Sequence, residues 1–407
     1  MIIAALFILL GLCGCKESGQ LEQENQSGKL EKRKEQVSAK EKQEKDYNIV
    51  IEEKEKSIFQ TECYRLEQSY IDIYKAVRKK DDQDSMLSKE NIKKIYHRIA
   101  GQGYSVTSES MNFNMKNYKQ VETFVEKVEA GAEAKVSIYK LNTDGGFERM
   151  DFEYDGDVMT LTSGVAGWSQ DIKPTAIEPV RCKIKKWKYT KKGWLIYEQC
   201  VPEPPEVTEV MNGNAMVRIK PLKEEYREIC ERLIIPVGYQ GNNLFLTDWD
   251  KESLEKIDFN DLYEYIFKVE NKNGLVEENV PNGIPKEEFE ELFTKYFPIT
   301  STQLEKMSVY QSKDKKYQWV RLGCGNYAPD MWGIPIPEVV DIKENEDGTT
   351  VLWIDAVWEG KGLDCAFSHK VTLNIKKGQD TSIQYLGNYI LDSEDAILPQ
   401  YNHRIKK

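Results

Sequence analysis

The sequence is poor in the residues and motifs that most often carry catalysis or bind metal ions. Its three histidines, His97, His369 and His403, lie far apart along the 407 residues. We find no P-loop, no glycine run of the dinucleotide-binding type, and no H-E-x-x-H, C-x-x-C or G-x-S-x-G motif. The sequence therefore gives no support to nucleotide, zinc or serine-hydrolase chemistry, and we expect neither a cofactor nor a metal site.

The chain also lacks the excess of positive charge that binding to nucleic acid requires. Its formal net charge is −11 at pH 7. Residues 1–14 are uncharged and residues 16–46 carry eight Lys or Arg against eight Asp or Glu, so the whole net charge falls on residues 47–407. The acidic balance argues against a nucleic-acid partner, and the length of the remainder suggests two domains.

The apolar run at the N-terminus is too short to cross a membrane as a helix. MIIAALFILLGLCG, residues 1–14, falls short of the ~20 residues that a spanning helix needs, but it matches the apolar part of a signal peptide. Its end, Leu12-Cys13-Gly14-Cys15, resembles a bacterial lipobox. Cleavage before Cys15 leaves the small Gly14 at the last position, whereas cleavage before Cys13 leaves Leu12 there. We therefore expect Cys15 to be lipidated and Cys13 to leave with the signal peptide.

Residues 15–46 are expected to anchor and tether the folded part. A diacylglyceryl group on Cys15 would hold the chain on the extracytoplasmic face of the cell membrane, because two acyl chains anchor a protein stably. Residues 16–46 have no aromatic residue and few apolar ones, which predicts a disordered, charged tether. A plain secretory signal, or a buried N-terminal helix, is the alternative to lipidation.

An N-terminal α+β domain is predicted over residues 47–205. Apolar residues at helical spacing predict helices over 58–77, 88–101 and 117–129. Ser88 is the expected N-cap of the second helix. The apolar period then changes to two, which predicts strands over 136–141, 150–154 and 158–162 and a hairpin over 182–201. Helices followed by hairpins indicate helices packed on an antiparallel sheet.

The second half of the chain repeats the order of helix and strands. Residues 206–285 are expected to form a helical connecting region, and residues 286–395 a C-terminal domain that begins with a helix at 286–297. Its strands are expected over 338–343, 349–358, 366–376 and 382–390. This order resembles the cystatin-like and nuclear-transport-factor-like folds, in which a helix lies in a curved sheet. Residues 396–407 are expected to form a tail.

Six cysteines follow the anchor region, an even number that permits disulfides in an extracytoplasmic chain. Cys182 and Cys200 flank the predicted hairpin. Cys324 precedes the C-terminal sheet and Cys365 lies at one of its turns. These two pairs are candidate disulfides, and buried reduced thiols are the equally good alternative.

Four stretches of the sequence carry a family resemblance. They are "VGYQGNNLFLTDWD" (237–250), "FPITSTQLEKM" (297–307), "RLGCGNYAP" (321–329) and "DAVWEGKGLDCAFSH" (355–369). Together they resemble an uncharacterised lipoprotein family of Gram-positive bacteria, over most of residues 60–395. The resemblance implies an anchored extracytoplasmic protein with a domain of unknown function, and it assigns no catalytic residue.

Two acidic clusters in the sequence are candidates for a calcium site or for acid–base chemistry. "TDWDKESLE" (247–255) fails as a calcium loop, because Ser253 and Phe259 occupy the positions that need Gly and Glu. Asp250 is instead expected to cap the following helix. Asp355, Glu359 and Asp364, together with His369, could do acid–base chemistry if they converge.

A ligand pocket is the other functional prediction. If the C-terminal sheet curves around its helix, one open end forms a pocket, with loops at its rim and His369 on the inward side of a strand. The candidate ligand-binding residues are Asn326, Tyr327, Trp332, Asp364 and His369. We therefore expect a non-enzymatic protein that binds a small ligand or an envelope protein. A cell-envelope hydrolase that uses Asp or Glu residues is the alternative.

Overall fold

The computed structural model describes residues 45–78, 87–108, 113–169, 172–272, 274, 283–323, 330–376, 382–391 and 394–405. Residues 46–407 form one compact unit. The predicted signal peptide, Cys15 and nearly all of the predicted tether lie outside the described residues, so these predictions stay untested. Among the helices of the described ranges, none has the length and apolar character needed to cross a membrane.

Four helices are described in the first part of the unit. They are α2 (Glu53–Gln68), α3 (Ile71–Arg78), α4 (Lys89–Gly101) and α5 (Lys119–Glu129). Ser88 caps α4 as predicted, since its side chain accepts a hydrogen bond from the Asn91 amide at 3.4 Å. The helix expected over 58–77 is instead two helices. Ser69 Oγ donates to the Leu66 carbonyl at 2.6 Å at the break, and this competition with the backbone accounts for the interruption.

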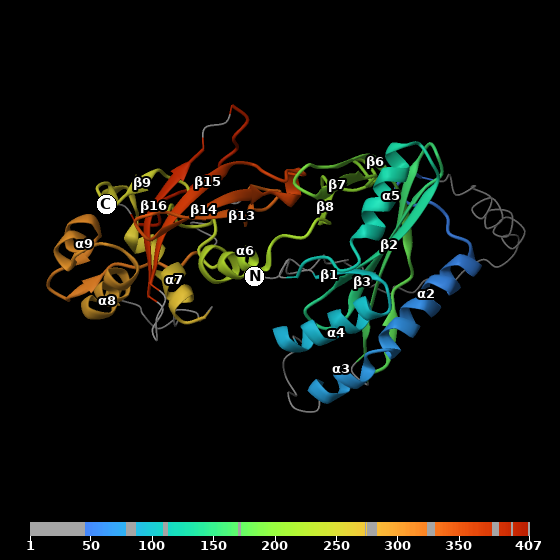
Figure 1. Cartoon of the computed structure of the whole chain (residues 1–407), viewed down its shortest axis with the longest axis horizontal. Helices are drawn as coiled ribbons and strands as arrows, with labels where there is room; N and C mark the ends of the chain where they lie inside the picture. The colour runs from blue at the N-terminus through green and yellow to red at the C-terminus, as the bar shows by residue number, and fades with distance from the viewer. Residues whose placement is uncertain are drawn as a thin grey trace, which may run out of the picture. The chain divides into compact units, whose positions relative to one another are not determined.

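An eight-stranded sheet follows, in the order β1-β2-β3-β4-β6-β7-β8 with β5 paired to β4. Its strands are β1 (Ser105–Ser108), β2 (Ala134–Leu141), β3 (Phe147–Tyr154), β4 (Met159–Trp168), β5 (Pro174–Ala176), β6 (Val180–Tyr189), β7 (Trp194–Gln199) and β8 (Asn214–Arg218). The β1–β2 pair is parallel and the others are antiparallel. Helices cover both faces (Figure 1): alternation along β2 sends Ile138 into a core with α5 and Tyr139 into a core with α2, α3 and α4.

The last part of the unit contains α6 (Glu224–Ile229), a π-helical turn (Cys230–Ile234), a 3₁₀ turn (Leu254–Lys256), α7 (Phe259–Glu270), α8 (Lys286–Tyr296), α9 (Ser301–Met307) and a second 3₁₀ turn (Glu359–Lys361). A five-stranded sheet has the order β13-β14-β15-β16-β9. Its strands are β13 (Ile336–Glu344), β14 (Thr349–Val357), β15 (Ser368–Lys376), β16 (Ser382–Ile390) and β9 (Trp249–Asp250). The short strands β10 (Ile284–Pro285), β11 (Tyr310–Gln311) and β12 (Lys316–Tyr317) form a third sheet.

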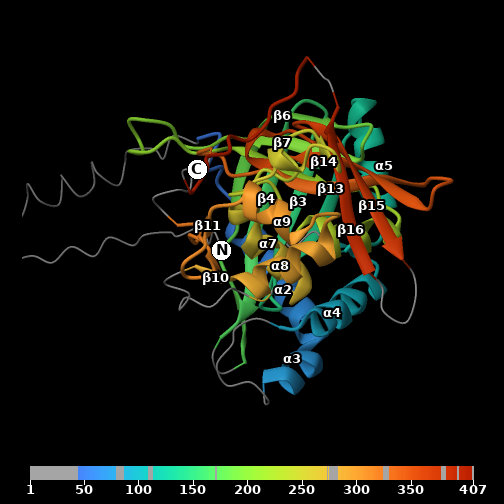
Figure 2. The ribbon, with the colours of Figure 1, turned by 90° about the vertical axis from the view of Figure 1, so that its left-hand side faces the viewer.

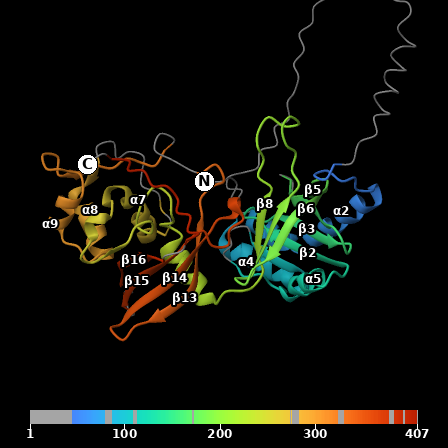
Figure 3. The ribbon, with the colours of Figure 1, turned by 90° about the horizontal axis from the view of Figure 1, so that it is seen from above.

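Helix α8 packs on the five-stranded sheet, as its apolar face predicts. Phe289, Phe293 and, just past the helix, Phe297 are fully buried. The Phe297 ring stacks on Tyr385 of β16, with 5.6 Å between the ring centroids. Figures 2 and 3 show α8 beside β16, with α7 and α9 close to it. The predicted α+β class, with helices packed on antiparallel sheets, is confirmed.

Three local predictions differ from the structure. Asn214–Arg218, expected in a helical connecting region, is a strand that pairs with β7. Residues 401–405, expected in a tail, pack against the core, and Ile405 is 3% exposed. Asp250 lies in β9 and does not cap α7, because the 3₁₀ turn intervenes and Asp258 caps that helix by accepting from the Asp261 amide at 3.2 Å.

Candidate functional site

A cavity of about 590 Å³ lies beside α6 and the start of β13, and we call it the α6 cavity. Its apolar walls include Leu222, Val237, Ile334, Ile336, Val339 and Val357. Ile235 and Ile336 are each 41% exposed, so they mark where the cavity meets solvent. This size, with mostly apolar walls and few polar groups, is typical of sites for small molecules.

The local backbone after α6 shapes the cavity. The helix widens into the π-helical turn, where the Ile235 amide donates to the Cys230 carbonyl at 2.9 Å. Single π turns often occur at functional sites, because they redirect the side chains that follow. Gly238, with φ +57°, then allows the chain to reverse so that Tyr239 and Gln240 line the cavity.

Two cations line the cavity without a carboxylate partner among the described residues. Arg227 of α6 donates to the Asn114 side chain at 3.4 Å. Lys268 of α7 has its Nζ 4.9 Å from the centroid of the Tyr265 ring. Burial lowers the pKa of both side chains, because removal from water disfavours their charged forms.

Two further donors in the cavity wall lack partners. Arg227 Nε and Gln240 Nε2 are buried, and neither has a hydrogen-bond partner in the described part of the chain. A buried donor without a partner costs about 1–3 kcal/mol. Unsatisfied groups in a native structure therefore require an explanation, and a role in binding a hydrogen-bond acceptor is one.

The acids of the cavity, in contrast, have cationic partners. Glu231 forms an ion pair with Lys89. Glu338 has a carboxylate oxygen 2.9 Å from Arg218 Nη1, and burial raises the pKa of its carboxyl. The cavity is therefore left with a surplus of positive charge from Arg227 and Lys268.

The residues predicted for the pocket rim lie elsewhere or outside the described residues. Asn326 and Tyr327 lie outside the described residues. Trp332 is half-buried, and its carbonyl accepts from Trp358 Nε1 at 3.3 Å. Asp364 is half-buried and does not line the α6 cavity. A neighbouring cavity of about 240 Å³, lined by Asp330, Trp358 and Lys361, shares Tyr239, Gln240 and Ile334 with the α6 cavity.

His369 is completely buried, as its place on the inward side of β15 predicts. Its Nδ1 lies 2.6 Å from Asn388 Oδ1, and its Nε2 lies 2.9 Å from the Tyr239 hydroxyl. Burial lowers the pKa of the imidazole to about 4, so it is neutral at pH 7. His369 therefore stands one layer behind the α6 cavity and holds Tyr239, which lines it.

Asp355 and His369 do not converge. On neighbouring strands Asp355 pairs with Ser368, whereas His369 pairs with Ile354, so the two side chains leave opposite faces of the sheet. The Asp355 carboxylate forms an ion pair with Lys192 and accepts from Ser368 Oγ at 2.6 Å. Cys365 is also close, 3.5 Å from this carboxylate, but burial raises the pKa of its thiol and makes it a poor nucleophile.

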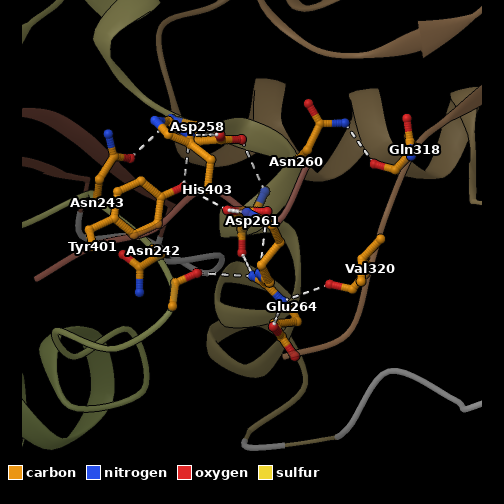
Figure 4. A network of polar contacts seen from close by, with 12 residues as sticks. Asn242, Asn243, Asp258, Asn260, Asp261, Glu264, Gln318, Val320, Tyr401 and His403 are labelled. Atoms are coloured by element: carbon orange, nitrogen blue, oxygen red, sulfur yellow. Dashed lines mark hydrogen bonds and ion pairs between the residues drawn. The ribbon is translucent and has the colours of Figure 1, made fainter. Parts of the chain in front are cut away.

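A polar network joins the C-terminal segment to the start of α7 (Figure 4). The side chain of Arg404 has no exposed surface; its Nε lies 3.2 Å from Asp261 Oδ1, and it also forms an ion pair with Glu264. It donates to the carbonyls of Val320, at 2.8 Å, and of Gly241, at 3.0 Å. Figure 4 shows Tyr401 and His403 beside Asp261 and Asp258, which they contact at 2.6 Å each.

The same network contains a set of potential metal ligands. One ligand atom each from Asp258, Asp261 and His403 lies within 4.8 Å of the others. Asp261, however, already accepts hydrogen bonds from Tyr401 and from the Arg404 amide, and the Arg404 guanidinium neutralises it. Burial raises the pKa of Asp261 while these donors lower it. These carboxylates already contact Tyr401, His403 and the Arg404 guanidinium, so we assign the group a structural role.

The candidate disulfides stay predictions. The described cysteines Cys182, Cys200 and Cys365 carry free thiols, and Cys182 Sγ lies 3.6 Å from Gln199 Oε1. Cys324 lies outside the described residues.

Sequence reasoning missed Arg227, Gln240 and Lys268. Each is an ordinary polar residue, either on an amphipathic helix or in a loop, and only the fold shows that its partner is missing. The glycines of "PVGYQGNN" (236–243) were the one local signal of an unusual turn here.

The comparison with protein families found a match to a family of unknown function, DUF6070, over residues 55–404. The comparison with curated proteins found no match, and neither did the comparison with solved structures. The matched range includes α6, the α6 cavity and Arg404. Because it covers most of the chain, this protein belongs to the DUF6070 family.

Proposed function

We propose that the protein is a membrane-anchored, extracytoplasmic protein that binds a small ligand in the α6 cavity. The observation that carries the binding role is the combination of apolar walls with buried donors, Arg227 Nε and Gln240 Nε2, that lack partners in the described residues. A ligand that accepts hydrogen bonds would remove the cost of leaving these donors unsatisfied. The anchoring role is supported by the lipobox-like end of the apolar N-terminal run.

The anchor is tested by two cysteine variants of the full chain. Cys15→Ser should release the protein from the membrane fraction, because the thiol that carries the lipid is gone. Cys13→Ser is the matched control and should stay anchored. Metabolic labelling with a palmitate analogue followed by membrane fractionation measures both. Equal loss of anchoring in the two variants would contradict the lipobox assignment.

The binding role is tested with a neutral apolar dye, Nile red. The full chain carrying Cys15→Ser, so that no detergent competes for the dye, should bind it. Ile235→Trp combined with Ile336→Trp should weaken binding, because both residues line the cavity and are partly exposed. Ile58→Trp with Ile177→Trp, at exposed positions that do not line the cavity, is the control. Unchanged dye binding in the first pair would contradict the proposed site.

The hydrolase alternative has its own test. The full chain is incubated with cell-wall and polysaccharide fragments, and products are followed by mass spectrometry. We expect no product that depends on Asp355, because its carboxylate is held by Lys192 and Ser368. Product formation that is lost in Asp355→Asn would overturn the binding role as the primary one.

A further inference from the structure

We propose that the ligand of the α6 cavity is an amphipathic anion, with an apolar body and a carboxylate or phosphate head group held by Lys268 and Arg227. This inference rests on the proposed function and names the class of ligand that the same cavity takes. Charge complementarity carries it, together with the shape and lining of the cavity.

The lining of the α6 cavity has two cations without an ion-pair partner in the described residues. Lys268 and Arg227 line the cavity from two different helices, α7 and α6. Neither has a carboxylate within ion-pair distance among the described residues, and Lys268 Nζ lies 4.9 Å from the centroid of the Tyr265 ring. Glu264 acts on Lys268, and Glu224 and Glu338 on Arg227, only at longer range. An anion bound by both would stabilise their charged forms, which burial disfavours, as the lowered pKa of each side chain indicates.

The charges of the cavity disfavour a cationic ligand. The two carboxylates of the lining each have an ion-pair partner, Glu231 with Lys89 and Glu338 with Arg218. A ligand cation would face Lys268 and Arg227 without a free carboxylate, and like charges in a partly buried site repel each other. The same geometry therefore selects against amines.

The apolar lining of the cavity determines what the rest of the ligand is. Most of the remaining lining of the cavity of about 590 Å³ is apolar and includes Val237, Ile334 and Val357. Small, fully hydrated anions such as inorganic phosphate gain nothing from such walls, whereas an alkyl chain gains about 0.8 kcal/mol for each CH₂ group removed from water. The occupant therefore has both an apolar body and a negative head group.

The donor geometry agrees with an oxyanion. Gln240 Nε2 and Arg227 Nε are buried donors that lack partners in the described residues, and both residues line the cavity. Carboxylate and phosphate oxygens accept several hydrogen bonds at once, and those from charged donors are the stronger ones. An alcohol head group would satisfy at most one or two of these donors.

The experiment compares four probes that share one alkyl chain. Laurate, dodecyl phosphate, dodecanol and dodecylamine, each below its aggregation concentration, are titrated against Nile red bound to the full chain carrying Cys15→Ser. We expect Kd values for laurate and dodecyl phosphate at least about tenfold lower than for dodecanol, and the weakest binding for dodecylamine. The ratio between laurate and dodecyl phosphate then distinguishes a carboxylate from a phosphate head group.

Charge variants link the preference to the named residues. Lys268→Gln should raise the Kd of laurate about tenfold while the Kd of dodecanol changes less than about twofold, because only the head-group contact is removed. Arg227→Gln should act in the same direction. Lys306→Gln, an exposed lysine at the end of α9, removes the same charge away from the cavity and should leave both constants unchanged.

The outcomes separate this inference from the proposed function. If all four probes bind with equal affinity, or if Lys306→Gln weakens laurate as much as Lys268→Gln does, the anionic preference is overturned and the cavity remains a binding site. If Nile red binds and none of the alkyl probes displaces it, the inference is overturned again. Failure of Nile red itself to depend on Ile235 and Ile336 contradicts the proposed function.

Discussion

Two buried polar regions of this protein differ in whether their cations form ion pairs with carboxylates. The side chain of Arg404 has no exposed surface and contacts the carboxylates of Asp261 and Glu264 and the carbonyls of Val320 and Gly241. Lys268 and Arg227, in the α6 cavity, meet an aromatic ring and one side-chain amide. Both regions use residues of α7, so one helix contributes carboxylates that pair with a cation at its start and carries a cation without an ion-pair partner in the described residues near its end.

The difference distinguishes buried charged groups that stabilise the fold from those that are available to bind a ligand. A buried ion pair with complete hydrogen bonds holds segments together, and removal of one partner is costly because the other charge stays buried. A partly buried cation without a partner reduces stability, and such groups are common at functional sites, where binding requires them. The comparison therefore predicts opposite effects of mutation in the two regions.

The largest effect is expected at Arg404. Arg404→Met leaves Asp261 and Glu264 buried without their cation, so the free energy of unfolding at pH 7 should fall by about 3–5 kcal/mol. Urea denaturation followed by tryptophan fluorescence measures this change. Arg98→Met is the matched control; its ion pair with Asp72 is exposed, and its loss should cost less than about 1 kcal/mol. Similar small losses in both variants would show that the C-terminal network does not stabilise the fold.

A second unpartnered group, away from the cavity, should reduce stability in a pH-dependent way. Glu67 of α2 has no exposed surface, and both its carboxylate oxygens lack hydrogen-bond partners in the described residues. Burial raises the pKa of its carboxyl to about 8. Between the ordinary value of 4.5 and about 8, the unfolded chain is ionised while the folded chain holds its proton, so stability falls as the pH rises.

Glu67→Gln tests this linkage. The substitution should raise the free energy of unfolding by roughly 2 kcal/mol at pH 7 and leave it nearly unchanged at pH 4. Urea denaturation at the two pH values measures the difference. Glu90→Gln, in an exposed pair with Lys94, should show little change at either pH. A stabilisation of equal size at pH 4 and pH 7 would rule out the titration of Glu67 as its cause.

The smallest stability effect, with the clearest functional effect, is expected at Lys268. Lys268→Met replaces a partly desolvated ammonium by an apolar side chain of similar length, and should raise stability at pH 7 by about 0.5 kcal/mol because the lysine is only partly buried. The same variant should lose the stabilisation by laurate that the unmodified chain shows. Thermal unfolding with and without laurate measures both effects. A variant that is less stable than the unmodified chain and is still stabilised by laurate would show that Lys268 supports the fold and does not bind the ligand.

Much of the fold follows from local sequence patterns. The strands over 349–357 and 382–390 were predicted nearly to their ends, because each is rich in β-branched and aromatic residues and is bounded by turn residues. Helix α4 was predicted from Ser88 and its apolar spacing. Strands β1 and β8 were missed, since four or five residues without clear alternation pair only because a longer neighbour is in place.

The buried polar contacts were much harder to predict. Arg404 lies 140 or more residues from the acids that hold it, and no local pattern distinguishes it from a residue in a disordered tail. His369 was correctly assigned to the inward face by strand parity, but its contact with Tyr239 depends on the loop after the π-helical turn. Missing partners, such as those of Lys268 and Gln240, become visible only when the whole surroundings are in place.

The most direct test of the account is a crystal structure of the full chain, carrying Cys15→Ser, with a laurate brominated at its terminal carbon. Anomalous scattering from bromine locates the alkyl end, and difference density locates the head group. We predict the bromine among the apolar walls near Val357 and Ile334, and the carboxylate within hydrogen-bond distance of Lys268 Nζ or Arg227. Bromine outside the α6 cavity, or a carboxylate turned to solvent away from both cations, would contradict the account.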